Sequence, residues 1–328
     1  MIHLVSSFVC RPSFAVHRFR RLRTLLPAAL CLLMLAGCDS GATPTGTGDA
    51  TQVPGANKLL VVVTTTQIRS MAQSVAGDLA DVRSILTPGA DPHEFEPKPS
   101  DVQAISKSAL ILKNGVGLDD WVDKILTNAG GQRPLVTVSA GIPIHLGDTS
   151  EPAGDPHIWF SVTNAMTMTR NIRDAFIQVD PTHAEQYRAN TEAYLAKLTD
   201  LDKYIMDQVA TIPPDERKMV TNHDGFGYFI ERYGLTFVGS IIPSMSTDAE
   251  PSAHDVADLI TKVKAEHVKA IFLESSINPQ LAQQIGQDAG VQVVDTLYGD
   301  TLGDVGTPGE TYEGMMRFNT DTIVAALK

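Results

Sequence analysis

Residues 180–214, which read DPTHAEQYRANTEAYLAKLTDLDKYIMDQVATIPP, contain a long helical pattern that divides the chain into two parts. The pattern opens with Asp-Pro, an N-cap followed by proline at the first helical position, and Pro213 and Pro214 end it. The apolar residues between these ends recur at spacings of three, four and seven: Tyr187, Tyr194, Leu198, Leu201, Ile205 and Val209. At 1.5 Å per residue, about thirty residues would make a rod of roughly 45 Å. We therefore predict a rigid linking helix over residues 181–212, with one lobe on each side of it.

Strand and helix patterns alternate on both sides of this segment. The first lobe, residues 58–180, opens after Lys58 with the apolar run LLVVV, which is typical of a strand buried on both faces. In the second lobe, residues 213–328, strand-like runs include Lys218–Asn222 and Ala270–Leu273, with helical patterns between them. This repetition predicts an α/β fold of two βα lobes, each with a parallel or mixed sheet covered by helices.

The first 37 residues have the features of a lipoprotein signal peptide. The basic run HRFRRLR at residues 17–23 precedes an apolar stretch from Leu25 to Ala36 that is too short to span a bilayer comfortably. The sequence Leu-Ala-Gly-Cys, which ends at Cys38, resembles the lipobox at which bacterial lipoproteins are cleaved and acylated. An uncleaved membrane anchor and a plain secretory signal are the alternatives. We expect residues 1–37 to be removed and Cys38 to carry lipid.

Residues 38–57 are rich in Gly, Thr, Ala and Pro, and predict a flexible tether between the lipid and the first lobe. The protein would then lie outside the cytoplasm, anchored to the membrane by the lipid on Cys38. This means the periplasmic face of the inner membrane, or the cell surface if the host has one membrane. Asp39 favours the inner membrane, because an aspartate after the acylated cysteine tends to retain lipoproteins there.

Cysteine usage and charge restrict the chemistry of the mature domain. Cys10 and Cys31 lie within the signal, so no cysteine remains for a disulfide or a thiolate, and any metal site must use nitrogen and oxygen ligands. The signal also carries five arginines and no acidic residue, so its removal moves the net charge from −12 to −17. Such an acidic domain argues against nucleic acid as a partner.

Four candidate ligands follow predicted strands, where loops at the carboxyl ends of an α/β sheet build ligand sites. They are His93, His157, His223 and Asp300. An isolated histidine more often caps a helix or hydrogen-bonds in a core, but here Asp-Pro-His occurs twice, and proline fixes the backbone just before each imidazole. Imidazole is a good ligand for zinc and neighbouring metals, and a carboxylate lowers the charge of the site.

Six stretches of the chain resemble the cluster A-I solute-binding proteins, the zinc- and manganese-binding lipoproteins of bacterial ABC importers. In chain order they are ADPHEFEPKPSD (90–101), DPHIWF (155–160), TNHDGFGYFIERYGL (221–235), EPSAHDVADLI (250–260), FLESSINPQ (272–280) and LYGDTLG (297–303). The resemblance covers residues 58–328 and implies two α/β lobes joined by one long helix, with the metal in the cleft between them. It also implies that His93 and His157 bind the metal from the first lobe, and His223 and Asp300 from the second.

The choice of metal rests on two features that disagree within the resemblance. Zinc-specific members often carry a His- and Asp-rich loop before the second histidine, whereas residues 141–154 contain only His145. Manganese-preferring members often have glutamate as the third ligand, and this chain has His223. Three imidazoles and one carboxylate suit a near-tetrahedral shell, which would hold zinc more tightly than manganese. We expect bound Zn²⁺, with Mn²⁺ as the alternative.

Other polar residues have less specific contexts. Asp224 and Glu274 are candidates to orient a histidine through its second ring nitrogen, as metal sites usually require, and a solvent-facing role is the alternative. Glu94 and Glu96 are excluded as ligands because helix-start and surface roles are commoner. No role is assigned to four further histidines: His145, His183, His254 and His267.

The sequence therefore predicts a monomeric, non-enzymatic protein that binds a divalent metal and delivers it to an ABC permease. The chain has no GxxxxGK[ST] phosphate loop, so separate permease and ATPase subunits are implied. A zinc hydrolase is one rival, but a bound Asp300 would leave no position for an activated water. A surface adhesin, in which the metal only stiffens the fold, is the other.

Overall fold

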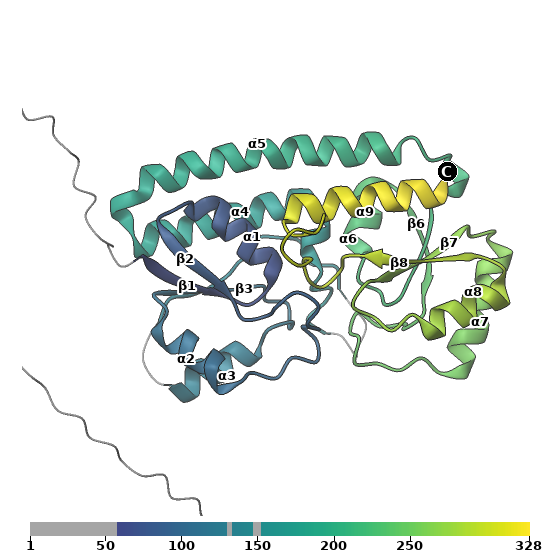
Figure 1. Ribbon diagram of the computed structural model, residues 1–328, viewed down its shortest axis with the longest axis horizontal. Helices are drawn as coiled ribbons and strands as arrows, with labels where there is room; N and C mark the ends of the chain where they lie inside the picture. The colour runs from purple at the N-terminus through teal and green to yellow at the C-terminus, as the bar shows by residue number, and fades with distance from the viewer. Residues whose placement is uncertain (1–57, 130–132, 147–151) are drawn as a thin grey trace, which may run out of the picture. The chain divides into compact units, whose positions relative to one another are not determined.

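The computed structural model describes residues 58–129, 133–146 and 152–328 (Figure 1). The predicted signal peptide, the lipidation site Cys38 and the tether lie outside the described residues. Within the described ranges, no helix combines the length and the apolar character needed to cross a membrane.

The first lobe contains four strands, and helices alternate with them along the chain. Its elements are β1 (Leu59–Val63), α1 (Thr66–Ala76), β2 (Ala80–Ser84), α2 (Pro99–Lys107), β3 (Leu110–Lys113), α3 (Trp121–Ala129), β4 (Leu135–Thr137), η1 (Ile158–Phe160) and α4 (Val162–Val179). The short helix η2 (Pro181–His183) and the long helix α5 (Ala184–Val209) then lead to the second lobe. The elements of the second lobe are η3 (Pro214–Glu216), β5 (Lys218–Thr221), α6 (Gly227–Tyr233), β6 (Thr236–Ser240), α7 (Ala253–Ala265), β7 (Ala270–Glu274), α8 (Gln280–Ala289), β8 (Gln292–Leu297) and α9 (Tyr312–Leu327).

The two lobes repeat one sheet topology, which confirms the predicted fold class. The strand order is β2-β1-β3-β4 in the first sheet and β6-β5-β7-β8 in the second, and every pairing is parallel. In each sheet the strand order reverses beside the lobe's first strand, and such switch points place ligand sites beyond the carboxyl ends of the strands.

Both faces of each sheet are buried, as the apolar strand sequences predict. In β1, Val61 and Val63 face the main core, while Val62 faces a separate cluster with residues of α2 and α3. In β7, Phe272 faces the main core and Ile271 joins a cluster under α7 and α8. This alternation follows from the two-residue period of a strand, so an uninterrupted apolar run supplies both faces of a helix-covered sheet.

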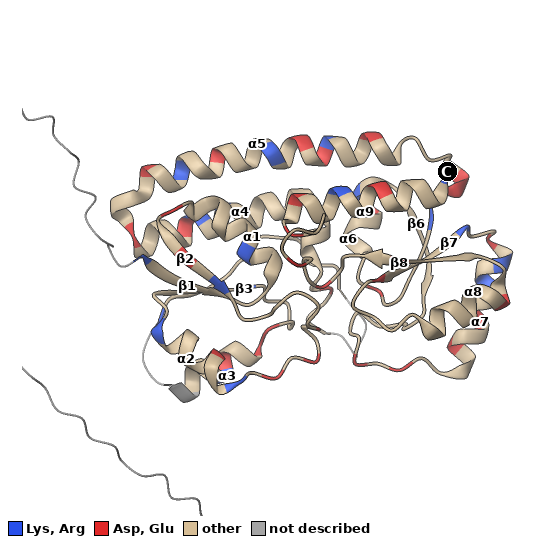
Figure 2. Ribbon diagram, viewed as in Figure 1, with Lys and Arg blue, Asp and Glu red and all other residues tan. Residues whose placement is uncertain are grey.

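Helix α5 spans the upper edge of Figure 1 and packs against α4, α1 and α9. Its 26 residues correspond to about 39 Å at 1.5 Å per residue. The buried stripe contains all six of the predicted apolar positions. Basic and acidic residues alternate along α5 in Figure 2, and include the pair Lys203 Nζ–Asp207 Oδ2 at 2.7 Å.

The α-helix begins at Ala184, three residues later than position 181, where the Asp-Pro signal placed its start. The strongest contacts of the Asp180 carboxylate are to side chains. It accepts hydrogen bonds from the Tyr187 hydroxyl at 2.8 Å and pairs with His183 Nδ1 at 2.7 Å. These side-chain contacts accompany a turn of 3₁₀ helix over Pro181–His183 before α5.

Helix α9 ties the end of the chain back to the first lobe. The Tyr312 backbone N–H donates to Ser70 Oγ at 3.0 Å, and the Tyr312 hydroxyl donates to the Trp159 carbonyl at 2.6 Å. The main hydrophobic cluster contains Val61 of the first sheet and Phe272 of the second. The two lobes therefore share one continuous core.

Candidate metal centre

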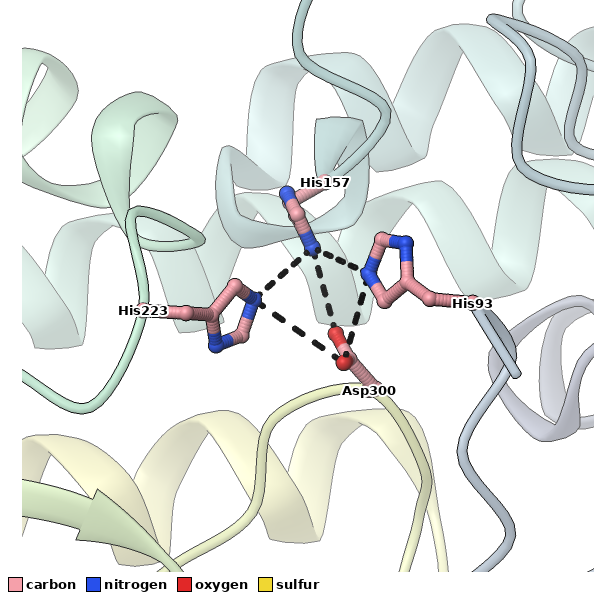
Figure 3. A group of neighbouring side chains, drawn as sticks. All are labelled: His93, His157, His223 and Asp300. Carbon is pink, nitrogen blue, oxygen red and sulfur yellow. Dashed lines mark hydrogen bonds and ion pairs between the residues drawn. The ribbon is translucent and has the colours of Figure 1, made fainter. Parts of the chain in front are cut away.

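The four predicted ligands meet beyond the carboxyl ends of four strands (Figure 3). His93 lies in the loop between β2 and α2, and His157 directly precedes η1 after the long connection from β4. His223 follows β5 by two residues, and Asp300 follows β8 by three. The donor atoms of all four side chains lie within 4.8 Å of one another.

His157 occupies the middle of the set. Its Nε2 lies 3.3 Å from His93 Nε2, 3.1 Å from His223 Nε2 and 3.3 Å from Asp300 Oδ1. Asp300 Oδ2 lies 3.6 Å from His93 Nε2 and 3.9 Å from His223 Nε2. A tetrahedral ion with ligand bonds of about 2.0–2.2 Å separates its ligands by roughly 3.3–3.6 Å. Three of these five distances lie within that range, so the cluster could hold a small four-coordinate ion.

All four side chains are shielded from solvent, and the side chain of His93 is 7% exposed. The exposed fractions are 0% for His157, 1% for His223 and 5% for Asp300. Asp300 Oδ1 is buried and has no hydrogen-bond partner within the described residues, although it lies at ion-pair distance from His157. A buried carboxylate oxygen without a donor is costly unless a cation is bound to it.

The charges of the site act on one another. Burial acts to lower the pKa of His157, but its hydrogen bond to Asp155 and the Asp300 carboxylate raise that pKa well above its ordinary value. Burial acts to raise the pKa of Asp300, but the charge of His223 and the other imidazoles holds it well below its usual range. Burial lowers the pKa of His93. A cation that binds here therefore competes with a proton at His157.

His93 differs from the other three residues of the cluster in its contact with a cavity. It lines a cavity of about 270 Å³ between the lobes. Gly117 and Pro156 contribute to the wall from the first lobe, and Met245 and Ser246 from the second. The other three ligands do not line this cavity.

Both Asp-Pro-His motifs fold in the same way, and the aspartate has a role that the sequence reasoning missed. Asp91 Oδ1 accepts the backbone N–H of His93 at 2.9 Å, and Asp155 Oδ1 accepts that of His157 at 2.9 Å. Such turns, in which Asp accepts from the residue two positions later, are a local preference of this side chain. The repeated motif was the signal for them.

Asp155 also holds the imidazole of His157. Its Oδ1 lies 2.7 Å from His157 Nδ1, so the ring donates its Nδ1 proton to the carboxylate and leaves Nε2 free to bind a metal. Tyr228 of α6 donates to the Asp155 carbonyl at 3.1 Å, which connects this loop to the second lobe.

We expect Asp155→Asn to weaken zinc binding by about 10-fold to 100-fold, the usual effect of losing a partner of a metal-bound histidine. The amide keeps the shape of the carboxylate but removes its charge, so the imidazole becomes a weaker donor. Competition with a zinc-binding dye measures the change. Unchanged affinity in a folded variant would show that Asp155 only shapes the turn.

The residues kept out of the predicted site also lie outside the cluster. His145 stacks on Tyr228 with ring centroids 3.9 Å apart and pairs with Glu231 Oε2 at 2.5 Å. His183 pairs with Asp180, and His254 lies 3.5 Å from Asp258 Oδ2 on α7. Of the two candidates to orient a histidine, Glu274 contacts His223, whereas the backbone N–H of Asp224 donates to the Ser244 carbonyl.

Two parallel α/β lobes with a buried cluster of three imidazoles and one carboxylate between them define a class of two-lobed proteins suited to binding a divalent ion. Residues 61–326 match the family described as "Zinc-uptake complex component A periplasmic", and the chain belongs to that family.

Similar proteins have names that differ in the metal. The iron ABC transporter substrate-binding lipoprotein MtsA of Streptococcus pyogenes serotype M1 is 33% identical over 316 residues, which cover 94% of this chain and 99% of the relative. The manganese-binding lipoprotein MntA of Halalkalibacterium halodurans is 35% identical over 295 residues, which cover 90% and 95%. Both names describe metal-binding lipoproteins, and the first also names an ABC transporter.

Solved structures share the fold. The periplasmic zinc-binding protein TroA of Treponema pallidum superposes with a TM-score of 0.77 at 32% identity, over 82% of this chain and 99% of that chain. The Mn-bound periplasmic metal-binding protein of Candidatus Liberibacter asiaticus has a TM-score of 0.75 at 28% identity, over 83% and 100%. One fold therefore accommodates proteins whose titles name different metals.

Proposed function

We propose that this protein binds a divalent transition metal, zinc in preference to manganese, outside the cytoplasm and delivers it to an ABC permease for import. The single observation that carries the proposal is the cluster of His93, His157, His223 and Asp300, with donor atoms spaced as the ligands of one small ion. In this proposal the ion is the cargo, and these four side chains replace its water.

The charge of the surroundings supports a divalent ion. Asp155, Glu274 and Asp300 are all buried, so neutral imidazoles would leave three negative charges inside the protein. Burying carboxylates costs several kcal/mol for each ion unless cations offset them. A divalent ion reduces the net charge of this group from −3 to −1.

The ligand types support zinc as the preferred ion. The spacing suits four ligands, and on the Irving–Williams order a site rich in imidazole binds zinc more tightly than manganese. Manganese is the alternative, because the names of the relatives include manganese and iron as well as zinc.

The proposal also covers the parts of the chain outside the lobes. Residues 1–37 would be a signal peptide, Cys38 would carry the lipid, and residues 38–57 would tether the protein to the membrane. The lobes would span residues 58–180 and 213–328, joined by the linking helix assigned to 181–212. The protein would act as a monomer with separate permease and ATPase subunits, and without nucleic acid.

Catalysis is the less favoured alternative. A zinc hydrolase needs an open coordination position for water, whereas Asp300 lies 3.3–3.9 Å from all three imidazoles. The relatives are named as binding proteins and transporter components. No specific observation supports a primary role in adhesion.

The proposed function is tested by metal content and competition binding on purified protein from Lys58 onward. We expect one equivalent of tightly bound zinc per chain, poorly displaced by manganese, and loss of that equivalent in His223→Ala. A preference for manganese would be consistent with the proposed transport role but would contradict the assignment of zinc as the bound metal. Absence of binding to any divalent metal would refute the site.

A further inference from the structure

We propose that Glu274 is the positioning residue that fixes His223 and Asp300 relative to each other, and that this constraint strengthens the preference of the site for zinc over manganese. The inference rests on the proposed function, because it assumes that both residues bind the metal. It adds a residue outside the ligand set and assigns it the choice of ion.

The sheet topology places Glu274 between the two ligands. It ends β7, which lies between β5 and β8 in the second sheet, and His223 and Asp300 follow these two neighbouring strands. Only 1% of Glu274 is exposed. A single side chain at the end of the middle strand can therefore contact both flanking loops.

Each carboxylate oxygen of Glu274 holds a different ligand. Oε1 lies 3.0 Å from His223 Nδ1, and Oε2 accepts the backbone N–H of Asp300 at 2.9 Å. Asn222 Nδ2 donates to Oε1 at 3.1 Å, so the carboxylate is held from a third side. The imidazole and the loop that presents Asp300 are thus connected through one rigid group.

The contact to His223 also selects the ring nitrogen that binds the metal. Two side chains face Nδ1, because Asn222 Nδ2 also lies 3.0 Å from it. In the tautomer that carries its proton on Nδ1, the ring donates to Oε1 and the Nε2 lone pair is directed at the other ligands. A carboxylate partner also strengthens the imidazole as a donor to the ion.

The backbone approaches both Glu274 and His223 closely. A Cβ atom placed on Gly299 would lie 1.8 Å from Glu274 Oε2, and one placed on Gly225 would lie 2.5 Å from His223 Nε2. Glycine is therefore required at these two positions by the close approach of the side chains. A larger residue at either position would displace Glu274 or His223 from the positions described here.

A fixed ligand pair discriminates between ions by geometry. Zinc accepts four ligands at short distances. Manganese favours six ligands, and a larger share of them are oxygen atoms. With Glu274 in place, His223 and the Asp300 loop cannot move apart to widen the shell. Loosening the pair should therefore weaken zinc binding much more than manganese binding.

The test compares zinc and manganese affinities of the wild-type protein, Glu274→Gln and Asp202→Asn. Glutamine keeps the shape but offers one acceptor and one donor, so it loses the contact to either His223 or Asp300. Asp202 is a matched control, because it is also a buried carboxylate and accepts from Arg232 and Tyr233 away from the metal ligands. Asp202→Asn therefore reports the general effect of losing a buried charge.

We expect Glu274→Gln to lower zinc affinity by about 10-fold to 100-fold, manganese affinity by far less, and the zinc-to-manganese ratio by about 10-fold. Asp202→Asn should leave the ratio unchanged. Bound Co²⁺ should show the strong visible absorption of a four-coordinate ion in the wild type and a weaker band in Glu274→Gln. If Glu274→Gln fails to fold, zinc and manganese affinities are compared in Glu274→Asp instead. This variant keeps the charge, but its side chain is shorter.

The outcomes separate this inference from the proposed function. If the wild type binds zinc and Glu274→Gln loses zinc and manganese affinity by equal factors, or loses neither, the role of Glu274 is wrong and the transport function stands. If the wild type binds no divalent metal, the proposed function fails and the inference fails with it.

Discussion

His157→Ala is expected to weaken zinc binding by about 100-fold or more, which is one of the two largest effects that we predict. Structural zinc sites bind with about 10–16 kcal/mol shared among four ligands, so one ligand contributes roughly 3 kcal/mol. Because 1.4 kcal/mol is a factor of ten, this loss is about 100-fold in affinity. His157 should show at least this effect, since its Nε2 lies within 3.3 Å of a donor atom of each other ligand.

His254→Ala is the control for the same substitution at a histidine outside the site. The His254 side chain is 83% exposed on α7, and its Nε2 lies 3.5 Å from Asp258 Oδ2. The zinc affinity of His254→Ala should match that of the wild type in a competition titration. If His157→Ala also binds zinc like the wild type, His157 is not a ligand and the central position of its Nε2 has another cause.

Much of the fold could be predicted from local sequence because the local signals agree with one another. The run LLVVV predicts a strand buried on both faces, and β1 has Val61, Val62 and Val63 fully buried. Ser252 is of a residue type favoured at helix N-caps, and its hydroxyl accepts the N–H of Asp255 at the start of α7. The exact start of α5 was missed, because the side chain of Asp180 had a competing partner in Tyr187, seven residues along the chain.

The four clustered side chains could be named from sequence because each follows a strand, and parallel strands bring their carboxyl ends to one edge. The residues that hold them are only partly predictable: Glu274 was a candidate to orient a histidine, but its contact with the Asp300 loop was not predicted. Glu274 precedes Asp300 by 26 residues and follows Asn222 by 52, so its contacts depend on the order of strands in the sheet. Strand order is not contained in any local pattern.

Contacts between the lobes were beyond sequence reasoning for the same reason. Gln67 Nε2 donates to the Gly299 carbonyl at 3.1 Å, and Thr66 Oγ1 accepts the N–H of Leu302 at 2.8 Å. The loop that carries Asp300 is thus held by the start of α1 in the first lobe as well as by Glu274 in the second. Polar residues at a helix start ordinarily predict capping, and nothing near Thr66 in the sequence indicates a partner more than 200 residues away.

Zinc should raise the melting temperature of the protein by roughly 10 °C. This shift and the loss of zinc affinity in His157→Ala are the two largest effects that we expect. At a free zinc concentration of 1,000 times Kd, binding stabilises the folded state by about 4 kcal/mol. The melting temperature of a domain of this size rises by about 2–4 °C for each kcal/mol of added stability. The physical reason is that the ion offsets buried carboxylates and connects ligands of both lobes. Differential scanning fluorimetry with zinc and with a chelator measures the shift.

The shape of the transition and the variants decide whether the shift comes from this site. The main hydrophobic cluster extends through both sheets, so the lobes should unfold in one transition with or without zinc. His157→Ala should lose most of the shift, and His254→Ala should keep all of it. An equal shift in both variants would place the stabilising zinc elsewhere. Two transitions that merge only when zinc is added would mean that the ion, and not the shared core, couples the lobes.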